Sequence, residues 1–361
     1  MLTMPFGIIV VRWDNRLGAV LEAKYPEDIR TTEDQIMKIY TAHAMGEAAA
    51  GFMSMRLGNL NVASYYGGWD LNYYVALLLT LEENADDYED GLAEVAASIF
   101  SKLENEEYKA ELEDLYNKLT RFPTLSEEQK MGVILSDPIR LSIVERLIEE
   151  GNTTISDLEV WLKHKLELKS VELYSFLAPL IKNGLVTTQW VEGLPSQCVF
   201  LIRDVFIARV PARMIVKRAK SGELSPEVAS DYLDEVKNFF RDYVITPEDT
   251  ETITKILSDP DAYDVLVALR ENILPKGGIH KLLNKKKSVV DSILRVFSKA
   301  GFIMELKINR KTHVALKTDI KIMTFFPEYL VEQIGQQYND QIKPPRMLLW
   351  HLKALRDSYP M

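Results

Sequence analysis

The sequence predicts a multidomain α+β protein. Its 361 residues exceed a single ordinary domain of about 100–200 residues. The first third of the chain has the alternation of strands and helices that builds a sheet domain, whereas the rest is mostly helical in pattern. In addition, the pentapeptide Ile134–Pro138 recurs at Ile256–Pro260, 122 residues later. We therefore expect a sheet domain followed by two related modules.

The composition is that of a globular protein, with 47% hydrophobic and 27% charged residues. The single cysteine, Cys198, cannot form an intrachain disulfide, which indicates a reducing compartment. The sequence begins without a basic stretch before its first apolar run, so no secretory signal is expected. The longest apolar runs, such as Val75–Leu79, are far shorter than the ~20 residues that span a bilayer. We expect a cytoplasmic protein without a membrane span.

The net charge of −10 is unevenly distributed along the chain. Residues 1–127 carry 10 Lys and Arg against 22 Asp and Glu, and residues 128–250 carry 15 against 19. Residues 251–361 reverse the sign, with 18 against 12. An acidic front and a basic back indicate different partners for the two ends, although charge also serves simply to keep each domain in solution.

Residues 1–125 are expected to form the sheet domain with a trailing helix. The run 6–13 is rich in valine and isoleucine, as strands are, and Pro26 ends the second strand because proline cannot continue a ladder. Thr31 or Thr32 is placed to cap the first helix. The expected order is β-β-α-β-β-β-α, followed by a charged helix. The strands are expected at 6–13, 19–25, 51–57, 61–66 and 72–81, and the helices at 32–46, 86–103 and 105–120.

A cluster of aromatic residues surrounds the expected turn at Gly67–Asp70. Aromatic side chains anchor many protein interfaces, which makes this cluster the candidate protein-interaction site of the domain. The same residue types also fill half-buried strand positions, and that structural role is the alternative. The candidate interaction residues are Tyr65, Tyr66, Trp69 and Tyr73.

The order and spacing of these elements resemble the longin domain, a relative of the profilin-like and roadblock sheets. The strand comes first in this chain, whereas roadblock domains begin with a helix. The resemblance implies a one-sided antiparallel sheet that contacts proteins, including small GTPases and trafficking machinery. A plain α/β scaffold that dimerises is the alternative.

Each copy of the repeat has an Asp-Pro pair at the start of a helix, where the aspartate caps the helix and the proline fits its first turn. Two further helices follow, and the third ends in a glycine, Gly184 or Gly301, as a left-handed cap requires. Beyond each glycine lies a two-stranded ribbon. The helices are expected at 139–150, 154–162 and 170–183 in the first copy and at 262–272, 278–283 and 288–300 in the second. The ribbons are expected at 185–191 with 198–205 and at 302–308 with 312–319.

Three helices followed by a ribbon are the layout of the winged helix-turn-helix. Through Leu135–Leu147 and Leu180–Val186, the first copy resembles the ArsR-type winged helix of prokaryotic and archaeal regulators. The resemblance implies that the third helix enters the DNA major groove. Winged helices also serve as pure protein-interaction modules, as in the tandem winged helices of ESCRT-II subunits. The metal-sensing cysteines and histidines typical of ArsR sensors are missing, so no metal site is expected.

Affinity for DNA comes mainly from lysine and arginine at the phosphates. The second copy concentrates basic residues at the entrance of its third helix and at the tip of its ribbon, where they can straddle the phosphate strands beside one groove. A solvated turn is the alternative for Lys285–Lys287. The first copy offers a nearly neutral set, namely Lys169, Ser170, Glu172, Ser175, Lys182 and Glu192. The candidate DNA-binding residues are Lys281, Lys285, Lys286, Lys287, Ser288, Arg295, Lys299, Arg310 and Lys311.

Further helices flank the two copies, at 214–218 and 225–243 between them and at 327–337 and 345–357 after the second. An apolar stripe on the last helix must be buried against this chain or against a second copy, which makes a homodimer one expectation. The stripe consists of Leu348, Leu349, Trp350, Leu352 and Leu355. The expected boundaries are 1–125 for the longin-like domain, 126–210 for the first winged helix, 211–247 for a helical linker, 248–322 for the second winged helix and 323–361 for the C-terminal helices.

The sequence lacks the common catalytic signatures. A Gly-x-x-x-x-Gly-Lys phosphate loop, Gly-x-Gly-x-x-Gly, His-Glu-x-x-His and Gly-x-Ser-x-Gly are all missing. The five histidines are scattered, and His43 on an apolar helix face is expected to be a satisfied core or surface residue. We expect no enzymatic activity, no cofactor and no catalytic or metal-binding residues.

Two functions remain as hypotheses. The first is a DNA-binding transcriptional regulator of archaeal or bacterial type, in which the second module reads double-stranded DNA, the first supports it or dimerises, and the longin-like domain receives a protein partner. The second is an interaction scaffold without DNA binding, in which the tandem winged helices pack as in ESCRT-II and the longin-like domain meets a small GTPase or a trafficking partner. The basic entrance and ribbon of the second module, set against the acidity elsewhere, favour the first.

Overall fold

The computed structural model describes residues 4–45, 51–69, 71–168 and 173–359. The protein is a mixed α+β structure that divides into two compact units, Met1–Leu125 and Ser126–Met361. Three residues assigned to the third helix of the first copy (Lys169, Ser170 and Glu172) lie outside the described residues, as does Asp70 of the expected turn. Among the described helices, none is long and apolar enough to cross a membrane.

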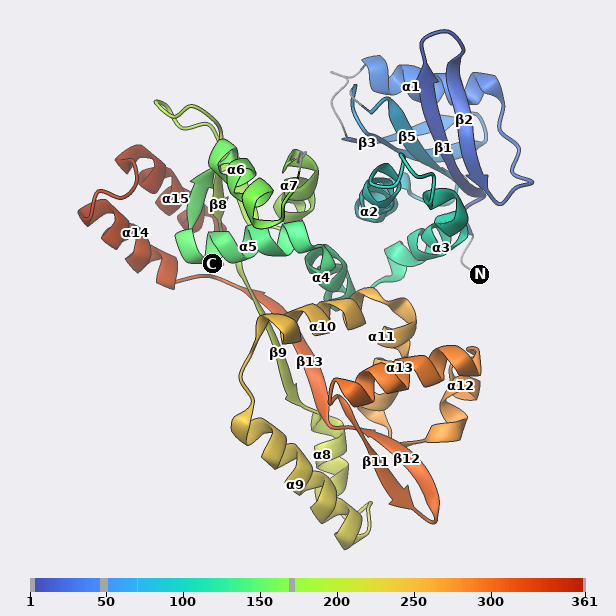
Figure 1. The fold of residues 1–361 in the computed structure, drawn as a ribbon, viewed down its shortest axis with the longest axis vertical. Helices are drawn as coiled ribbons and strands as arrows, with labels where there is room; N and C mark the ends of the chain where they lie inside the picture. The colour runs from blue at the N-terminus through green and yellow to red at the C-terminus, as the bar shows by residue number, and fades with distance from the viewer. Residues whose placement is uncertain (1–3, 46–50, 70, 169–172, 360–361) are drawn as a thin grey trace. The chain divides into compact units, whose positions relative to one another are not determined.

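The first unit contains a five-stranded sheet with three helices (Figure 1). Neighbouring strands are antiparallel throughout, in the order β2-β1-β5-β4-β3. The strands are β1 (Gly7–Asp14), β2 (Gly18–Tyr25), β3 (Gly51–Leu57), β4 (Leu60–Tyr66) and β5 (Tyr73–Leu79). The helices are α1 (Glu33–Met45), α2 (Glu89–Phe100) and α3 (Tyr108–Arg121), with the short 3-10 turns η1 (Ala85–Tyr88) before α2 and η2 (Phe122–Thr124) after α3.

Both faces of this sheet are covered by helices, which corrects the expectation of a one-sided sheet. Successive side chains of a strand point to opposite faces. In β1, Ile8 and Val10 join the core beneath α2 and α3, whereas Ile9 and Val11 join the core beneath α1. All four are fully buried. A strand that is apolar on both faces needs cover on both sides, and Figure 1 shows α1 on one face and α2 with α3 on the other.

Local signals account for where the helices of this unit begin. Thr32 caps α1, because its Oγ1 accepts from the amide of Gln35 at 3.2 Å while the Gln35 side chain accepts from the amide of Thr32 at 3.0 Å. The helix expected at 86–103 is shorter in the structure. η1 occupies its first turn and α2 ends at Phe100.

The second unit consists of two repeats with the same order of helices and strands. The first repeat comprises α4 (Glu127–Ser136), α5 (Pro138–Glu150), β6 (Asn152–Thr154), α6 (Ile155–Lys165), α7 (Leu173–Lys182), β7 (Val186–Gln189), β8 (Cys198–Leu201), β9 (Asp204–Pro211), α8 (Arg213–Lys220) and α9 (Pro226–Asp242). The second comprises α10 (Pro247–Ser258), α11 (Pro260–Glu271), β10 (Leu274–Pro275), η3 (Lys276–Gly278), α12 (Ile279–Leu282), α13 (Lys287–Lys299), β11 (Ile303–Ile308), β12 (Lys311–Leu316), β13 (Thr318–Phe325), α14 (Tyr329–Asn339) and α15 (Pro345–Ser358).

The caps expected from the sequence are present in both repeats. The Asp137 carboxylate accepts from the amides of Ile139 and Arg140 at the start of α5, and Asp259 does the same at the start of α11. Gly184 and Gly301 have φ angles of 67° and 75°, which side chains other than glycine rarely adopt. Each repeat then forms a small sheet in the same order, β6-β8-β7 and β10-β12-β11.

The return strand of each hairpin is shorter than expected, and a separate strand follows it. β8 ends at Leu201 and β12 at Leu316, rather than at 205 and 319. At each break, one carbonyl accepts from two successive amides: that of Leu185 in the first repeat and that of Phe302 in the second. The chain turns there and continues as β9 or β13. These two strands pair with each other in antiparallel register from Asp204–Phe325 to Pro211–Thr318.

The first helices of the two repeats also contact each other. α4 packs on α10 so closely that Gly132 lies directly against Leu257, where a β-carbon would overlap the Leu257 side chain. The contacts at this junction are reciprocal, because α4 touches β13 and α10 touches β9. The two repeats are therefore related in the manner of two subunits about a two-fold axis.

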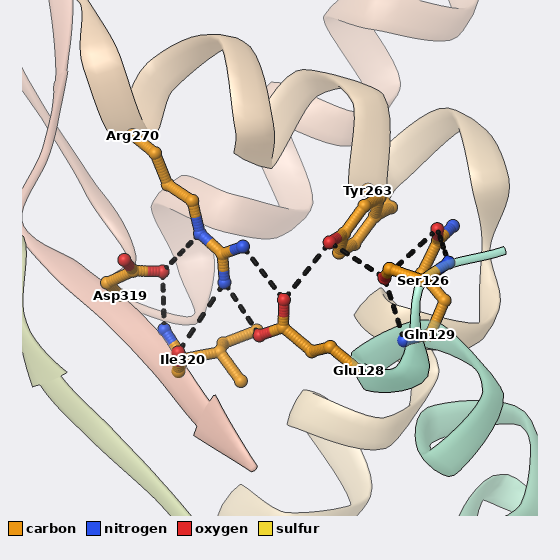
Figure 2. Close-up of polar contacts among 7 residues, drawn as sticks. All are labelled: Ser126, Glu128, Gln129, Tyr263, Arg270, Asp319 and Ile320. Carbon is orange, nitrogen blue, oxygen red and sulfur yellow. Dashed lines mark hydrogen bonds and ion pairs between the residues drawn. The ribbon is translucent and has the colours of Figure 1, made fainter.

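A polar network fastens the start of the first repeat to the second (Figure 2). Arg270 donates two hydrogen bonds to the carboxylate of Glu128, at 2.7 and 2.8 Å, and a third to Asp319 at 2.7 Å. The hydroxyl of Tyr263 donates to Glu128 at 3.1 Å and lies 3.0 Å from the hydroxyl of Ser126, which caps α4. Burial disfavours the charge of Arg270, but its hydrogen bonds and the two carboxylates outweigh that and raise the pKa of the guanidinium.

The flanking helices are exchanged between the repeats (Figure 1). β9 carries α8 and α9 to the second repeat, where α8 packs on α11 and α9 on β11. β13 carries α14 and α15 back to the first, where α15 packs on β8. The segment expected to be a linker is therefore part of the fold of the second repeat.

Equivalent residues of α9 and α15 bind equivalent carbonyls. The hydroxyl of Tyr232 donates to the Leu316 carbonyl at 2.8 Å, and Nε2 of His351 donates to the Leu201 carbonyl at 2.8 Å. Both side chains are fully buried. In the tail stripe, Leu348 and Leu355 are buried within the chain, whereas Leu349 is 68% exposed.

We predict that Gly132→Ala destabilises the protein by about 1–3 kcal/mol, because an added methyl overpacks the α4–α10 contact. Chemical denaturation followed by circular dichroism measures this. Gly335→Ala in α14 is the matched control, since a β-carbon there meets no atom within 4 Å. That change should be neutral or stabilise by up to about 1 kcal/mol. Equal effects of the two changes would contradict the close contact at Gly132.

Candidate nucleic-acid interface

A groove of about 880 Å³ lies in the second repeat between α13 and the β11–β12 hairpin. One wall is helical and the other is formed by the hairpin. Basic side chains line both walls, and η3 contributes one more, together with two carboxylates of the lining. The charged lining residues are Lys276, Lys287, Asp291, Arg295, Glu305 and Lys311.

α13 buries most of its apolar residues on one face, and Val296, which is 52% exposed, is the exception. Val290, Ile293, Leu294 and Phe297 are buried in the core of the repeat. Residues three or four apart share a helix face, so Ser288, Ser292, Arg295 and Lys299 form the opposite, exposed face. The helix therefore presents a basic and hydroxyl-bearing surface along its length.

The structure leaves most of the predicted basic residues in solvent. Within the described residues, the exposed cations among the predicted DNA-binding residues form no ion pair with a carboxylate. Arg295 donates only from Nε to the carbonyl of Asp291 within its own helix, at 3.3 Å, so its terminal nitrogens remain open. The exposed cations are Lys281, Lys286, Lys287, Arg295, Lys299, Arg310 and Lys311.

Lys285 is an exception among the predicted residues, and its expected role at DNA is corrected. Its ammonium group is bound between Asp261, at 2.5 Å, and Asp264, at 2.7 Å, and its side chain is only 12% exposed. Burial lowers the pKa of Lys285, but the hydrogen bonds and charges of the two aspartates outweigh it, so the pKa is raised. The side chain anchors the entrance of α13 to α11 and is not available to a phosphate.

The tip of the hairpin is a two-residue turn, Asn309-Arg310, between β11 and β12. Both residues have positive φ, 49° and 61°, which is the conformation that the strand twist favours in such tight turns. Arginine adopts it at a cost that asparagine or glycine would avoid. The turn places Arg310 at the tip of the hairpin, exposed to solvent and next to Lys311.

Several groove residues were not foreseen from the sequence. Lys276 lines the groove and pairs with Glu305 at 2.6 Å, so it is partly neutralised. Thr312 lines the hairpin wall, and Asp291 and Ser298 line the helical wall. Helical spacing from Arg295 points to both Asp291 and Ser298. Nothing local in the sequence marks Lys276, because the hairpin brings Glu305 to it across 29 residues.

The corresponding surface of the first repeat has a different character. The buried residues Leu173, Leu177 and Leu180 of α7 match Val290, Leu294 and Phe297 of α13 at a constant offset of 117 residues. With this offset, the positions of Arg295 and Ser298 are occupied by Ala178 and Ile181.

The hairpin of the first repeat also lacks a basic tip. Eight residues, 190–197, separate β7 from β8. Trp190 in this loop is 63% exposed, and Glu192 pairs with Arg346 at 2.7 Å. Tyr174 of α7 bonds to Gln197 of the loop at 3.1 Å, which links helix and hairpin where the second repeat is open.

In the first unit, the predicted aromatic cluster is divided between core and surface. Tyr66 is buried beside α1 and donates to Asn72 at 3.3 Å, so it cannot anchor a partner. Tyr65 and Tyr73 are half-buried against the other core, beneath α2 and α3. Trp69 is 57% exposed and is the member of the cluster available for contact.

The two buried histidines in the described part of the chain have structural partners. Burial lowers the pKa of both His43 and His351 to about 4, and His43 lies 2.8 Å from the Ser64 hydroxyl, as expected for a satisfied core residue. Burial raises the pKa of the Cys198 thiol to about 11. Within residues 4–45, 51–69, 71–168 and 173–359, no group of His, Cys, Asp or Glu could hold a metal ion.

No protein-family model matches the chain, and no curated protein matches it either. A function therefore has to be inferred from the fold and from the groove. The structure defines an antiparallel sheet unit and a pair of repeats, each with helices and a β-hairpin. The basic groove between α13 and its hairpin is the strongest candidate site in the described part of the chain.

We predict that Lys285→Ala destabilises the protein by about 1–2 kcal/mol, a value between those of exposed and buried ion pairs. Two aspartates lose their common cation, and α13 loses its tie to α11. Thermal unfolding at neutral pH measures the loss. The neighbouring exposed Lys286→Ala is the control and should change stability by less than about 0.5 kcal/mol. If both changes were silent, Lys285 would be a solvated lysine rather than an anchor.

Proposed function

We propose that this chain is a non-enzymatic, DNA-binding transcriptional regulator whose second repeat acts as a winged helix. The supporting observation is the groove between α13 and the β11–β12 hairpin, which has unpaired cations on both walls. Two basic walls separated by a groove suit a duplex, because phosphates line both sides of the DNA major groove. α13 would lie in that groove, and the hairpin would follow the adjacent backbone.

The residues divide by the part of DNA they would contact. Lys286 and Lys287 at the start of α13, with Arg310 and Lys311 at the hairpin tip, would bind phosphates and set the position of the protein. Ser288, Ser292 and Arg295 on the exposed face of α13 would meet base edges. There arginine pairs with guanine, and a serine hydroxyl can either donate or accept a hydrogen bond. The carboxylate of Asp291 would favour cytosine at its position, since it accepts from the cytosine amino group.

Charge distribution fits this assignment. The last 111 residues carry an excess of basic groups, whereas the first 127 carry 22 acidic residues against 10 basic ones. The acidic part repels phosphate, so the duplex would be directed to the basic groove. Binding of this kind depends steeply on salt, because each phosphate contact releases counterions.

The first unit would receive a protein partner. Its element order resembles the longin domain, and Trp69, in the segment that joins the strands of the half-buried Tyr65 and Tyr73, offers an exposed aromatic side chain. Aromatic residues are common anchors of protein interfaces. The partner would then influence the regulator through a unit separate from the DNA groove.

A second candidate function is an interaction scaffold without DNA binding. The face of the first repeat supports it, because Tyr174, Ile181 and Trp190 are 52%, 38% and 63% exposed. Apolar side chains in solvent at the place of a DNA-contacting surface are typical of winged helices that bind proteins. The scaffold requires no cation in the groove of α13. Replacing those cations should therefore weaken binding to the partner only if the partner is DNA.

We predict that the full chain binds duplex DNA with an affinity that falls steeply with salt. In Lys286→Ala/Lys287→Ala/Arg295→Ala, the slope of log K against log salt should lose about 2, or about 0.9 for each of the two phosphate contacts removed, and the loss of Arg295 should weaken binding further. Fluorescence anisotropy on a labelled random-sequence duplex measures both quantities. The full chain is needed, since β9, α8 and α9 of the first repeat complete the second.

Arg30→Ala/Arg56→Ala/Lys118→Ala removes the same charge from exposed positions of the first unit and serves as the control. Its salt slope should equal that of the unchanged protein. Loss of binding in both variants would mean that net charge alone is responsible. No binding by the unchanged protein at low salt would exclude the regulator and leave the scaffold.

A further inference from the structure

The two repeats are arranged like the subunits of a dimer, although they belong to one chain. β9 pairs with β13, α4 packs on α10, and each repeat receives the flanking helices of the other. In a DNA-binding dimer of two identical chains, such an arrangement presents two equal recognition helices to two half-sites about 10 bp apart. The question is whether both halves of this internal dimer can meet DNA.

Matching positions of the two repeats differ along the groove wall of α13, whereas Ser292 and Lys299 on its outer face are matched by the like residues Ser175 and Lys182 of the first repeat. At the offset of 117 residues that aligns the cores of α7 and α13, Arg295 corresponds to Ala178 and Ser298 to Ile181. Asp291 corresponds to Tyr174, whose hydroxyl bonds to Gln197. In the second repeat, the helical wall of the groove is polar and, among the described residues, is not bonded to the hairpin. In the first repeat, the matching wall is mostly apolar, and Tyr174 bonds it to the hairpin.

The hairpin tips differ in the same direction. Arg310 and Lys311 extend from the tight turn of the second repeat without carboxylate partners among the described residues. The longer loop of the first repeat carries Glu192 and the exposed Trp190. Phosphate affinity requires cations at such a tip, and no residue of the loop 190–197 is basic.

From this asymmetry we infer that the protein recognises DNA with one half of an internal dimer. The α13 groove takes a single half-site, and the α7 face stays off the duplex. This rests on the proposed DNA binding and specifies its form. One chain occupies one site, the site has no two-fold symmetry, and no inverted repeat is needed.

A DNA-cleaving probe attached at matching positions of the two repeats tests the inference. Ser298→Cys and Ile181→Cys place a thiol at equivalent points of α13 and α7. The native Cys198 is the only other cysteine, and it is buried with its pKa raised to about 11, so it should not react. Each full-length variant carries an iron–EDTA group and is mixed with a random-sequence duplex of about three helical turns, enough for two half-sites.

We expect strand cleavage from position 298 and only background cleavage from position 181. Comparable cleavage from both positions would overturn the inference, as would cleavage from position 181 alone. If neither position cleaves although anisotropy shows bound DNA, the groove is not the contact and the inference also falls. Failure of the underlying proposal is distinguishable from these results, because in that case the unmodified protein shows no anisotropy change at all.

Discussion

The antiparallel pairing of β9 with β13 is the constraint on which the rest of the second unit depends. Each strand leaves its own repeat and carries two helices onto the other. Tyr232 and His351, from those exchanged helices, satisfy the carbonyls of Leu316 and Leu201, which would otherwise be buried without a partner. The core of each repeat is completed by the other, so we expect the two repeats to fold as one cooperative unit.

The junction between the repeats combines close packing with a polar network. Gly132 allows α4 to approach α10 at Leu257, and any larger side chain would separate the helices. Around the edge, Arg270 is held by Glu128 and Asp319. Partly buried ion pairs add little net stability, since removing charges from water opposes the attraction between them. Their geometric demands are strict, however, and a three-point contact to Arg270 fixes how α4 meets α11 and β13.

The sequence predicted those features that depend only on residues close together in the chain. The caps at Asp137 and Asp259 and the left-handed glycines after α7 and α13 involve atoms only a few residues apart, and they lie where the sequence placed them. The exchange of helices was not predicted, because it depends on β9 meeting a strand more than a hundred residues away. Lys285 was misjudged for a similar reason, since Asp261 and Asp264 reach it from another helix. Strand alternation places Tyr65 and Tyr66 on opposite faces of the sheet, so the two could not belong to one surface cluster.

The pattern of difference between the repeats has a physical explanation that bears on function. Core positions such as those of Leu177 and Leu294 are apolar in both repeats, because a polar side chain there would be buried without partners. The outer faces of α7 and α13 carry no such requirement, since either cations or apolar groups leave the helices stable. A substitution on one of those outer faces therefore changes the stability of the fold little, although it changes the surface that the repeat offers to a partner. The basic character of α13 and its hairpin, against Ala178, Ile181 and Trp190 in the first repeat, follows this division. Stability does not account for Arg295 and Lys311, which form no ion pair within the described residues.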